Sequence, residues 1–153
     1  MTTVVVATDL SRVSAHAVEV GVDLARRLSA RLLLLNVLDL GRLSGLGRHD
    51  RVDQARAERE PVLLEKVRAA RDAGVEAEYL LWQGSPVEAI TDAATSEGAE
   101  MIVVGSHRRR GPGRTLLGSV SDGLVRTAGV PVLIVPSEAD TQGSAAEAQS
   151  ITA

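Results

Sequence analysis

The chain has 153 residues, no cysteine and a net charge of −3 at neutral pH. This length is typical of one domain with a real core, and the absence of cysteine excludes disulfides, thiolate metal sites and cysteine nucleophiles. The acidic balance and the scarcity of aromatic residues argue against a nucleic-acid surface. No apolar stretch approaches the roughly 20 residues of a membrane span, and no basic leader precedes the first strand pattern, so we expect a cytoplasmic protein without a membrane partner.

The first third of the chain alternates strand and helix patterns. Val4–Ala7 is a short β-branched run, and Ser11 stands at the N-cap position of a helix predicted over Ser14–Leu28. The apolar run Leu32–Val37 predicts a second buried strand. Asp39–Gly47 is rich in glycine and has no periodicity, so it is predicted to be a mobile loop.

The middle of the chain continues this alternation. Residues Arg51–Ala73 have helical periodicity, but Pro61 removes an internal hydrogen bond, which predicts either a kink or two consecutive helices. Val75–Trp82 alternates like a strand with one wetter face, so we place it at a sheet edge. Gly84–Pro86 then predicts a turn that starts a helix over Val87–Ser96.

The last third supplies two more strands and one helix. Met101–Val104 is predicted to be the fourth strand, Gly118–Thr127 the last helix, and Val130–Pro136 the fifth strand. The remainder consists mostly of Ala, Ser, Gln and Glu. We therefore expect one domain over residues 1–137 and a disordered tail over residues 138–153.

The order of these elements predicts the fold class. Strands that alternate with helices through right-handed crossovers form an α/β fold, an open five-stranded parallel sheet with helices on both faces. Ligands of such sheets bind beyond the carboxyl ends of the strands. Those ends carry Ala7–Asp9, Val37 and Gly105–Ser106 here, so we expect the site at that edge.

The segment between the fourth strand and the last helix has the composition of an anion-binding loop. It contains glycines and four arginines, and no acidic residue occurs from Met101 through Ser121. Glycines let backbone N–H groups approach a ligand, the N-terminus of a helix adds unpaired donors, and guanidinium groups match phosphate geometry. The segment is neither a P-loop nor a Gly-x-Gly-x-x-Gly site. The alternative is a solvated hairpin whose glycines only permit a turn.

These residues resemble the nucleotide-binding members of the universal stress protein family, whose loop reads Gly-x-x-Gly, nine residues, then Gly-Ser/Thr. Gly105 takes the first position and Gly118–Ser119 the last, at the spacing that this pattern requires. Val4–Asp9 resembles the first strand and acidic turn of the family, Leu32–Val37 its second strand, and Gly84–Ile90 its third crossover.

The resemblance implies a binding site for ATP. By position, Ala7, Thr8 and Asp9 would border the adenine and ribose, and Val37 would face the adenine. The residues implied for the phosphates are Gly105, Ser106, His107, Arg108, Arg109, Arg110, Gly111, Gly118, Ser119, Val120 and Ser121. Arg108 stands where the pattern has its second glycine, so it either supplies a guanidinium to the phosphates or blocks them.

The implied function is an adenine-nucleotide-binding, dimeric stress-response or signalling module with little or no turnover, at most a weak ATPase. Asp9 and Asp39 could hold Mg²⁺ through waters beside the nucleotide, although turn chemistry explains each of them equally well. The alternative is a stress protein that binds no nucleotide and acts through protein partners. We expect a homodimer built on Val130–Pro136, because an exposed apolar edge strand tends to be covered.

Two further interpretations carry less weight. Ser119, His107 and Asp9 would lie near one sheet edge and could be imagined as a hydrolytic triad. However, Ser119 is better explained as a hydroxyl at a helix start. Arg108–Arg110 could contact nucleic acid, but phosphate contacts alone give only weak, salt-sensitive association.

Overall fold

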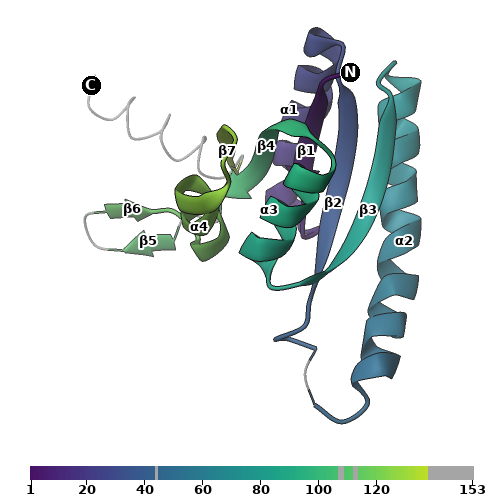
Figure 1. Cartoon of the computed structure of the whole chain (residues 1–153), viewed down its shortest axis with the longest axis vertical. Helices are drawn as coiled ribbons and strands as arrows, with labels where there is room; N and C mark the ends of the chain where they lie inside the picture. Colours follow the sequence, from purple (N-terminus) through teal and green to yellow (C-terminus); the bar gives the residue numbers. More distant parts are fainter. Residues whose placement is uncertain (44, 107–108, 112–113, 138–153) are drawn as a thin grey trace, which may run out of the picture.

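The chain forms an open parallel sheet with helices on both faces (Figure 1). The computed structural model describes residues 1–43, 45–106, 109–111 and 114–137. Its elements are β1 (Thr3–Ala7), α1 (Arg12–Leu28), β2 (Arg31–Asp39), α2 (Arg48–Asp72), β3 (Ala77–Gly84), α3 (Pro86–Ser96), β4 (Ala99–Ser106), β5 (Arg109–Gly111), β6 (Arg114–Leu116), α4 (Ser119–Thr127) and β7 (Val132–Pro136).

The sheet has the strand order β3-β2-β1-β4-β7, and every pairing in it is parallel. This confirms the predicted α/β fold. The central strand β1 pairs Val5 with Leu33 of β2 and with Ile102 of β4. These strands are buried on both faces, which explains why they read as nearly continuous aliphatic runs rather than as alternating patterns.

Two aliphatic layers fill the space between the sheet and the helices. Val4 and Val6 of β1 belong to the layer under α1 and α2, and Val5 belongs to the layer under α3 and α4. Successive side chains of a strand point to opposite faces, so one short β-branched run supplies both layers. The core contains no phenylalanine, so close packing of Val, Leu, Ile and Ala stabilises the fold.

The first helix begins as its sequence predicts. The Ser11 side chain caps α1 by accepting a hydrogen bond from the Ser14 N–H at 3.3 Å. Near its other end, Arg26 and Arg27 lie 2.8 and 2.7 Å from the Asp23 carboxylate. The hydrogen bond from Arg26 is the main reason that the pKa of Asp23 is lower than its ordinary value. The two arginines also suit the negative end of the helix dipole.

Helix α2 runs through Pro61 as one element, so the predicted alternative of two consecutive helices is wrong. Pro61 has no N–H to donate to the Ala57 carbonyl one turn earlier. Both residues are exposed, so water can satisfy that carbonyl. Proline is therefore tolerated on the solvent side of this helix.

The remaining boundaries differ from the predictions in small ways. β3 is an edge strand as predicted, but it spans Ala77–Gly84 rather than Val75–Trp82. β7 forms the other edge, over Val132–Pro136. Within the arginine-rich segment, β5 and β6 pair antiparallel, with Arg109 opposite Leu116, and Figure 1 shows this pair projecting from the sheet. The predicted tail, residues 138–153, lies outside the described residues.

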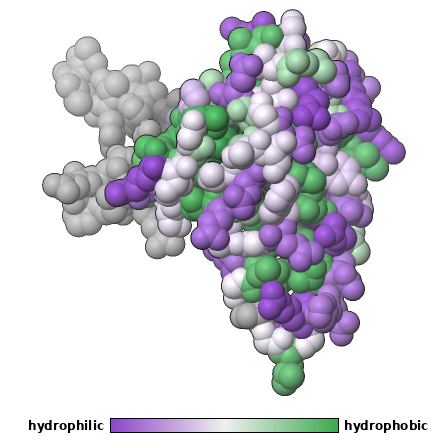
Figure 2. Space-filling view, viewed as in Figure 1, coloured by the Kyte–Doolittle hydropathy of each residue, from purple (hydrophilic) through white to green (hydrophobic). Residues whose placement is uncertain are grey.

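The distribution of apolar residues on the surface is the one expected when helices cover the faces of a sheet. On the face that Figure 2 shows, which is the side of α3 and α4, apolar residues occur in separate groups among polar ones. None of the helices in the described part of the chain is both long and apolar enough to cross a bilayer.

Candidate functional site

A cleft of about 1290 Å³ opens at the carboxyl ends of β1, β2 and β4. The first turns of α1, α3 and α4 and the middle of α2 complete its walls. This is the edge at which the sequence places the site. The predicted site residues that line it are Ala7, Thr8, Asp9, Val37, Gly105, Ser106, Gly118, Ser119, Val120 and Ser121.

The other predicted residues lie in the arginine-rich segment. His107 and Arg108 fall outside the described residues. Arg109, Arg110 and Gly111 form β5. The question of whether Arg108 admits a ligand or blocks it therefore stays a prediction.

The N-terminus of α4 forms one end of the cleft. Gly118 is its N-cap, with φ −62° and ψ 159°, and as a glycine it has no side chain to cap the first turn. The Asp122 N–H donates to the Gly118 carbonyl at 2.9 Å, whereas the N–H groups before it in the helix have no place in its internal ladder. Unpaired donors and the positive end of the helix dipole together favour an anion here.

Ser106, at the end of β4, lines the same cleft with a buried hydroxyl. The residue is only 1% exposed, and its Oγ makes no hydrogen bond to any described residue. Buried hydroxyls are nearly always hydrogen-bonded, so this exception calls for an explanation. Ser121 differs, since its Oγ donates to the Gly105 carbonyl at 3.4 Å. Of these two predicted serines, Ser106 therefore has the unused donor.

Gly105 has a structural reason that is independent of any ligand. A Cβ at this position would lie 3.3 Å from the Ser14 Cα and 3.5 Å from the Val13 carbonyl oxygen. Both neighbours are backbone atoms in the first turn of α1. The first glycine of the loop pattern is thus favoured by the close approach of α1 to β4, whether or not a ligand binds.

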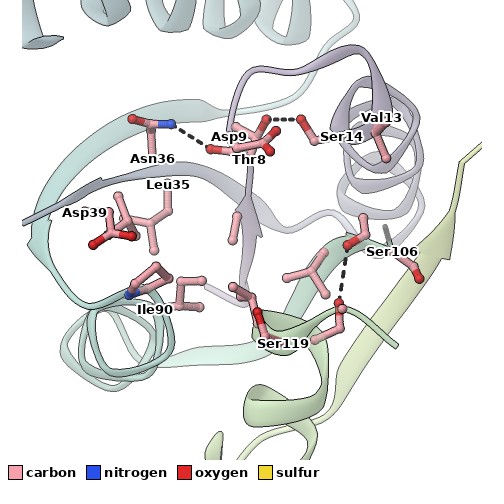
Figure 3. A pocket seen from close by; sticks show the side chains of 18 of the residues that line it. Thr8, Asp9, Val13, Ser14, Leu35, Asn36, Asp39, Ile90, Ser106 and Ser119 are labelled. Carbon is pink, nitrogen blue, oxygen red and sulfur yellow. Dashed lines mark hydrogen bonds between the residues drawn. The ribbon is translucent and has the colours of Figure 1, made fainter. Parts of the chain in front are cut away.

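The turn after β1 is held by local hydrogen bonds, drawn in part in Figure 3. The Thr8 hydroxyl lies 2.9 Å from the Ser14 hydroxyl and accepts from the Leu10 N–H at 3.1 Å. The Asp9 carboxylate accepts from the Ser11 N–H at 2.9 Å. Asp9 therefore orients the turn before α1, as the sequence predicts for an acidic residue in this position.

Asn36 and Arg59 line the cleft near the end of β2, and sequence analysis did not identify them. The Asn36 amide nitrogen donates to the Thr8 carbonyl at 2.8 Å, as Figure 3 shows. Arg59 of α2 donates through Nη1 to the Asn36 side-chain oxygen at 2.9 Å and to the Val37 carbonyl at 3.1 Å. The available signal was a single amide within the apolar run of β2, but nothing in the sequence indicated its partner 23 positions away.

An apolar wall faces this polar side. It is formed by the ends of the strands and the first turn of α3, and its members include Ala7, Leu35, Val37, Pro86, Ile90 and Val104. In Figure 3, Leu35 and Ile90 lie on the side of the cleft away from Ser106 and Ser119. A slot with apolar walls and a few polar groups is typical of sites for flat organic ligands.

Charges of both signs line the cleft. Asp9, Asp39 and Asp122 bring three carboxylates, and Arg42 and Arg59 bring two guanidinium groups. Asp39 accepts from the Gly41 N–H at 3.0 Å and lies 3.6 Å from Arg42. Among the described residues, no three potential metal ligands are grouped closely enough to hold an ion. The described part of the site thus offers an anion subsite but no preformed metal cage.

Comparison with known proteins places this geometry in a family. The family model described as the universal stress protein family matches residues 1–136. A universal stress protein of Methanocaldococcus jannaschii is 30% identical over 136 residues, which cover 86% of this chain and 80% of that protein.

Two solved structures are similar in fold, and their descriptions name ligands. A universal stress protein in complex with cAMP is 29% identical, with a TM-score of 0.69 over 88% of this chain and 96% of the other. The universal stress protein of Archaeoglobus fulgidus in complex with dAMP is 22% identical, with a TM-score of 0.65 over 88% of this chain and 98% of the other. The family model matches residues 1–136, and the relative from Methanocaldococcus jannaschii is 30% identical. On these two findings, the chain belongs to the universal stress protein family.

Proposed function

We propose that this protein binds adenine nucleotides, with ATP as the main ligand, and acts as a dimeric stress-response or signalling module. The observation that carries the proposal is the pairing of a helix N-terminus whose N-cap is a glycine with the Ser106 hydroxyl, which has no partner among the described residues, at one end of a cleft whose far wall is apolar. An anion subsite beside an apolar slot matches a molecule with phosphate at one end and a flat base at the other. The nucleotide complexes of the two relatives support the same ligand class.

The proposed orientation follows from the strand order. The first turn of α4 lies beside the end of β4, where Ser121 contacts Gly105, and two strand spacings, roughly 10 Å, separate β4 from β2. We assign the phosphates to Gly118–Ser121 and Ser106, and the base to the apolar end beside Val37. Ala7–Asp9, on the strand between them, then border the ribose and the base.

The charge balance of the cleft limits the proposed chemistry. Asp122, in the first turn of α4, pairs with Arg126 at 3.2 Å and still places a carboxylate near the proposed phosphates. The arginines of residues 108–114 or a bound Mg²⁺ would offset it. Among the described residues, no group of three His, Cys, Asp or Glu side chains could hold a metal ion. We therefore propose binding with little or no hydrolysis.

The direct test is calorimetry of the full chain with ATP, beside a Gly118→Val variant. The N-cap backbone of Gly118 is extended, so a side chain fits its dihedral angles and the variant should fold. Its bulk would stand between the helix N-terminus and the phosphates. We expect the wild type to bind ATP and the variant to lose binding while still folding, with a loss of no more than about 1 kcal/mol in stability because valine is a poorer N-cap than glycine.

The matched control is Thr127→Val, at the other end of the same helix, which should bind as the wild type does. Mass spectrometry of the denatured, freshly purified protein would identify any nucleotide that copurifies. If the wild type gives no heat with ATP below millimolar concentration and releases no nucleotide, the proposal is wrong. The partner-only stress protein is then the better description.

A further inference from the structure

Arg59 holds two parts of the cleft wall at once, although it belongs to a helix on the far side of β2 from the anion subsite. Its Nη1 atom donates to the Val37 carbonyl at 3.1 Å and to the Asn36 side-chain oxygen at 2.9 Å. Asn36 passes the connection on through its 2.8 Å bond to the Thr8 carbonyl. One guanidinium thus ties α2 to the ends of β2 and β1.

We propose that Arg59 is a positioning residue for the nucleoside end of the ligand, acting through Asn36 and the Val37 carbonyl. The inference rests on the proposed function, because it assigns a role within the same cleft. Arg59 lies at the β2 end, away from the α4 N-terminus that would take the phosphates. Its effect should therefore concern the base and the ribose rather than the charge of the phosphates.

Burial makes this chain of hydrogen bonds strict. Asn36 is 1% exposed, so without Arg59 its side-chain oxygen would be left unpaired in the interior, which is costly. The amide could then rotate, and the Thr8 carbonyl would lose its donor. Thr8 precedes Asp9, so the turn beside the ligand would loosen together with the end of β2.

Arg59 also fixes the direction of the Val37 carbonyl. A backbone carbonyl has two lone pairs, and Arg59 uses one of them from the α2 side. Together with the β2–β3 ladder, which pairs Val37 with Trp82 and Leu38 with Gln83, this bond holds the peptide after Val37 in one orientation beside the slot. A fixed peptide at the slot can discriminate between bases, since a base with misplaced donors leaves buried groups unpaired.

The test compares Arg59→Met with Arg56→Met on the same helix. Methionine keeps the apolar stem of arginine but removes all its donors. Arg56 is a suitable control because its only described ion pair is a 3.9 Å surface contact with Glu60, and it does not line the cleft. Trp82 is the only tryptophan and the register partner of Val37 on β3, so its fluorescence can report binding.

We expect Arg59→Met to weaken the binding of adenosine, AMP and ATP by the same factor. That factor should be about tenfold, which is typical of the loss of hydrogen bonds from a charged group. The preference for ATP over GTP should fall as well, and Arg56→Met should change neither. A loss that grows with the number of phosphates would instead indicate a direct phosphate contact and would overturn the inference. Unchanged binding by Arg59→Met would overturn it too.

A double-mutant cycle tests the route through Asn36. If Arg59 acts through Asn36, the double variant Arg59→Met/Asn36→Leu should bind nucleotide about as weakly as whichever single variant binds more weakly. If the losses in binding free energy of the two single variants instead add up in the double variant, that route is contradicted. Should Arg59→Met fail to fold, Arg59→Lys keeps the charge and can reach only one of the two oxygens, so an intermediate loss is expected. A wild type that binds none of the nucleotides refutes the proposed function itself, which distinguishes the two failures.

Discussion

Ser106 and Gly105 are neighbours at the end of β4, yet different forces account for them. Gly105 is favoured by the backbone of α1, against which a Cβ would be crowded. Ser106 satisfies no such demand, because its hydroxyl is buried and has no partner among the described residues. A buried, unpaired hydroxyl destabilises the ligand-free protein, and such a group is expected where a ligand completes its bonding.

This contrast gives the first prediction, for Ser106→Ala. Alanine removes the unpaired hydroxyl, so the ligand-free variant should be as stable as the wild type or more stable by up to about 1 kcal/mol. It should also bind ATP several-fold more weakly. Thermal unfolding with and without ATP measures both effects.

The matched control is Ser14→Ala, because Ser14 is also buried but its hydroxyl is hydrogen-bonded. The Ser14 hydroxyl lies 2.9 Å from the Thr8 hydroxyl and donates to the Ser11 carbonyl at 3.1 Å. Its loss should destabilise the ligand-free protein by about 1 to 2 kcal/mol. If Ser106→Ala destabilised the protein as much as Ser14→Ala, the Ser106 hydroxyl would have a structural partner and the argument would fail.

The sequence could indicate those site residues that lie in strand ends and in the loop pattern, because the fold class alone brings strand ends together. It could not indicate Arg59. That residue reaches the cleft because of the way α2 packs along β2 and β3. Its position depends on this tertiary packing rather than on spacing in the sequence. The apolar wall from α3 was missed for the same reason, since Ile90 reads as an ordinary core residue of a helix.

Helices approach the sheet and each other most closely at glycines. A Cβ on Gly21 of α1 would lie 2.3 Å from the Val6 Cγ2, and one on Gly123 of α4 would lie 2.7 Å from the Val87 Cγ2. The two sites differ in freedom. Val6 is fully buried in the central strand, whereas Val87 is half-buried at the start of α3.

We therefore predict different effects on stability for the two alanine variants. Gly21→Ala should destabilise the protein by about 1 to 3 kcal/mol, because the overlap with Val6 exceeds the gain of about 1 kcal/mol in helix propensity. Gly123→Ala should be close to neutral, because Val87 can move aside. Chemical denaturation of both variants measures the difference, and equal losses would show that burial of the neighbour does not decide the outcome.

The elements themselves were predictable to within a few residues, and the exceptions have physical causes. Ser11 and Pro86 mark helix starts by capping and by fixed φ, and both act locally. The alternative of two consecutive helices around Pro61 was wrong because the effect of a proline depends on which side of α2 faces water. The sequence could not decide between a hairpin, which the β5–β6 pair forms, and an anion-binding loop. Both use the same residue types, glycine for turns and arginine for solubility or for binding phosphate.

In the described part of the chain the sheet ends at two edge strands, β3 and β7, and their surroundings differ. On the β3 side, α2 packs against Tyr79 and Leu81 in the first core layer. On the β7 side, Leu133 is 37% exposed, and the flanking Val132 and Ile134 are only partly buried. An apolar edge strand with unpaired backbone groups tends to pair with another strand. These features support a homodimer through the predicted segment Val130–Pro136.

The last prediction tests this interface with Leu133→Lys. A lysine on an edge strand opposes pairing, since its charge would be buried between the two copies. We expect the wild type to be a dimer at micromolar concentration and the variant a monomer, as measured by light scattering after size exclusion. Leu28→Lys is the control, because Leu28 is also exposed but lies at the end of α1, so it should leave the dimer intact. A monomeric wild type would refute the interface, and a dimer that survives Leu133→Lys would place it on another surface.

Since β7 follows α4 directly in the chain and pairs with β4 beside Ser106, a dimer through this edge would place the two anion subsites next to the same interface. Nucleotide binding should then change the dissociation constant of the dimer.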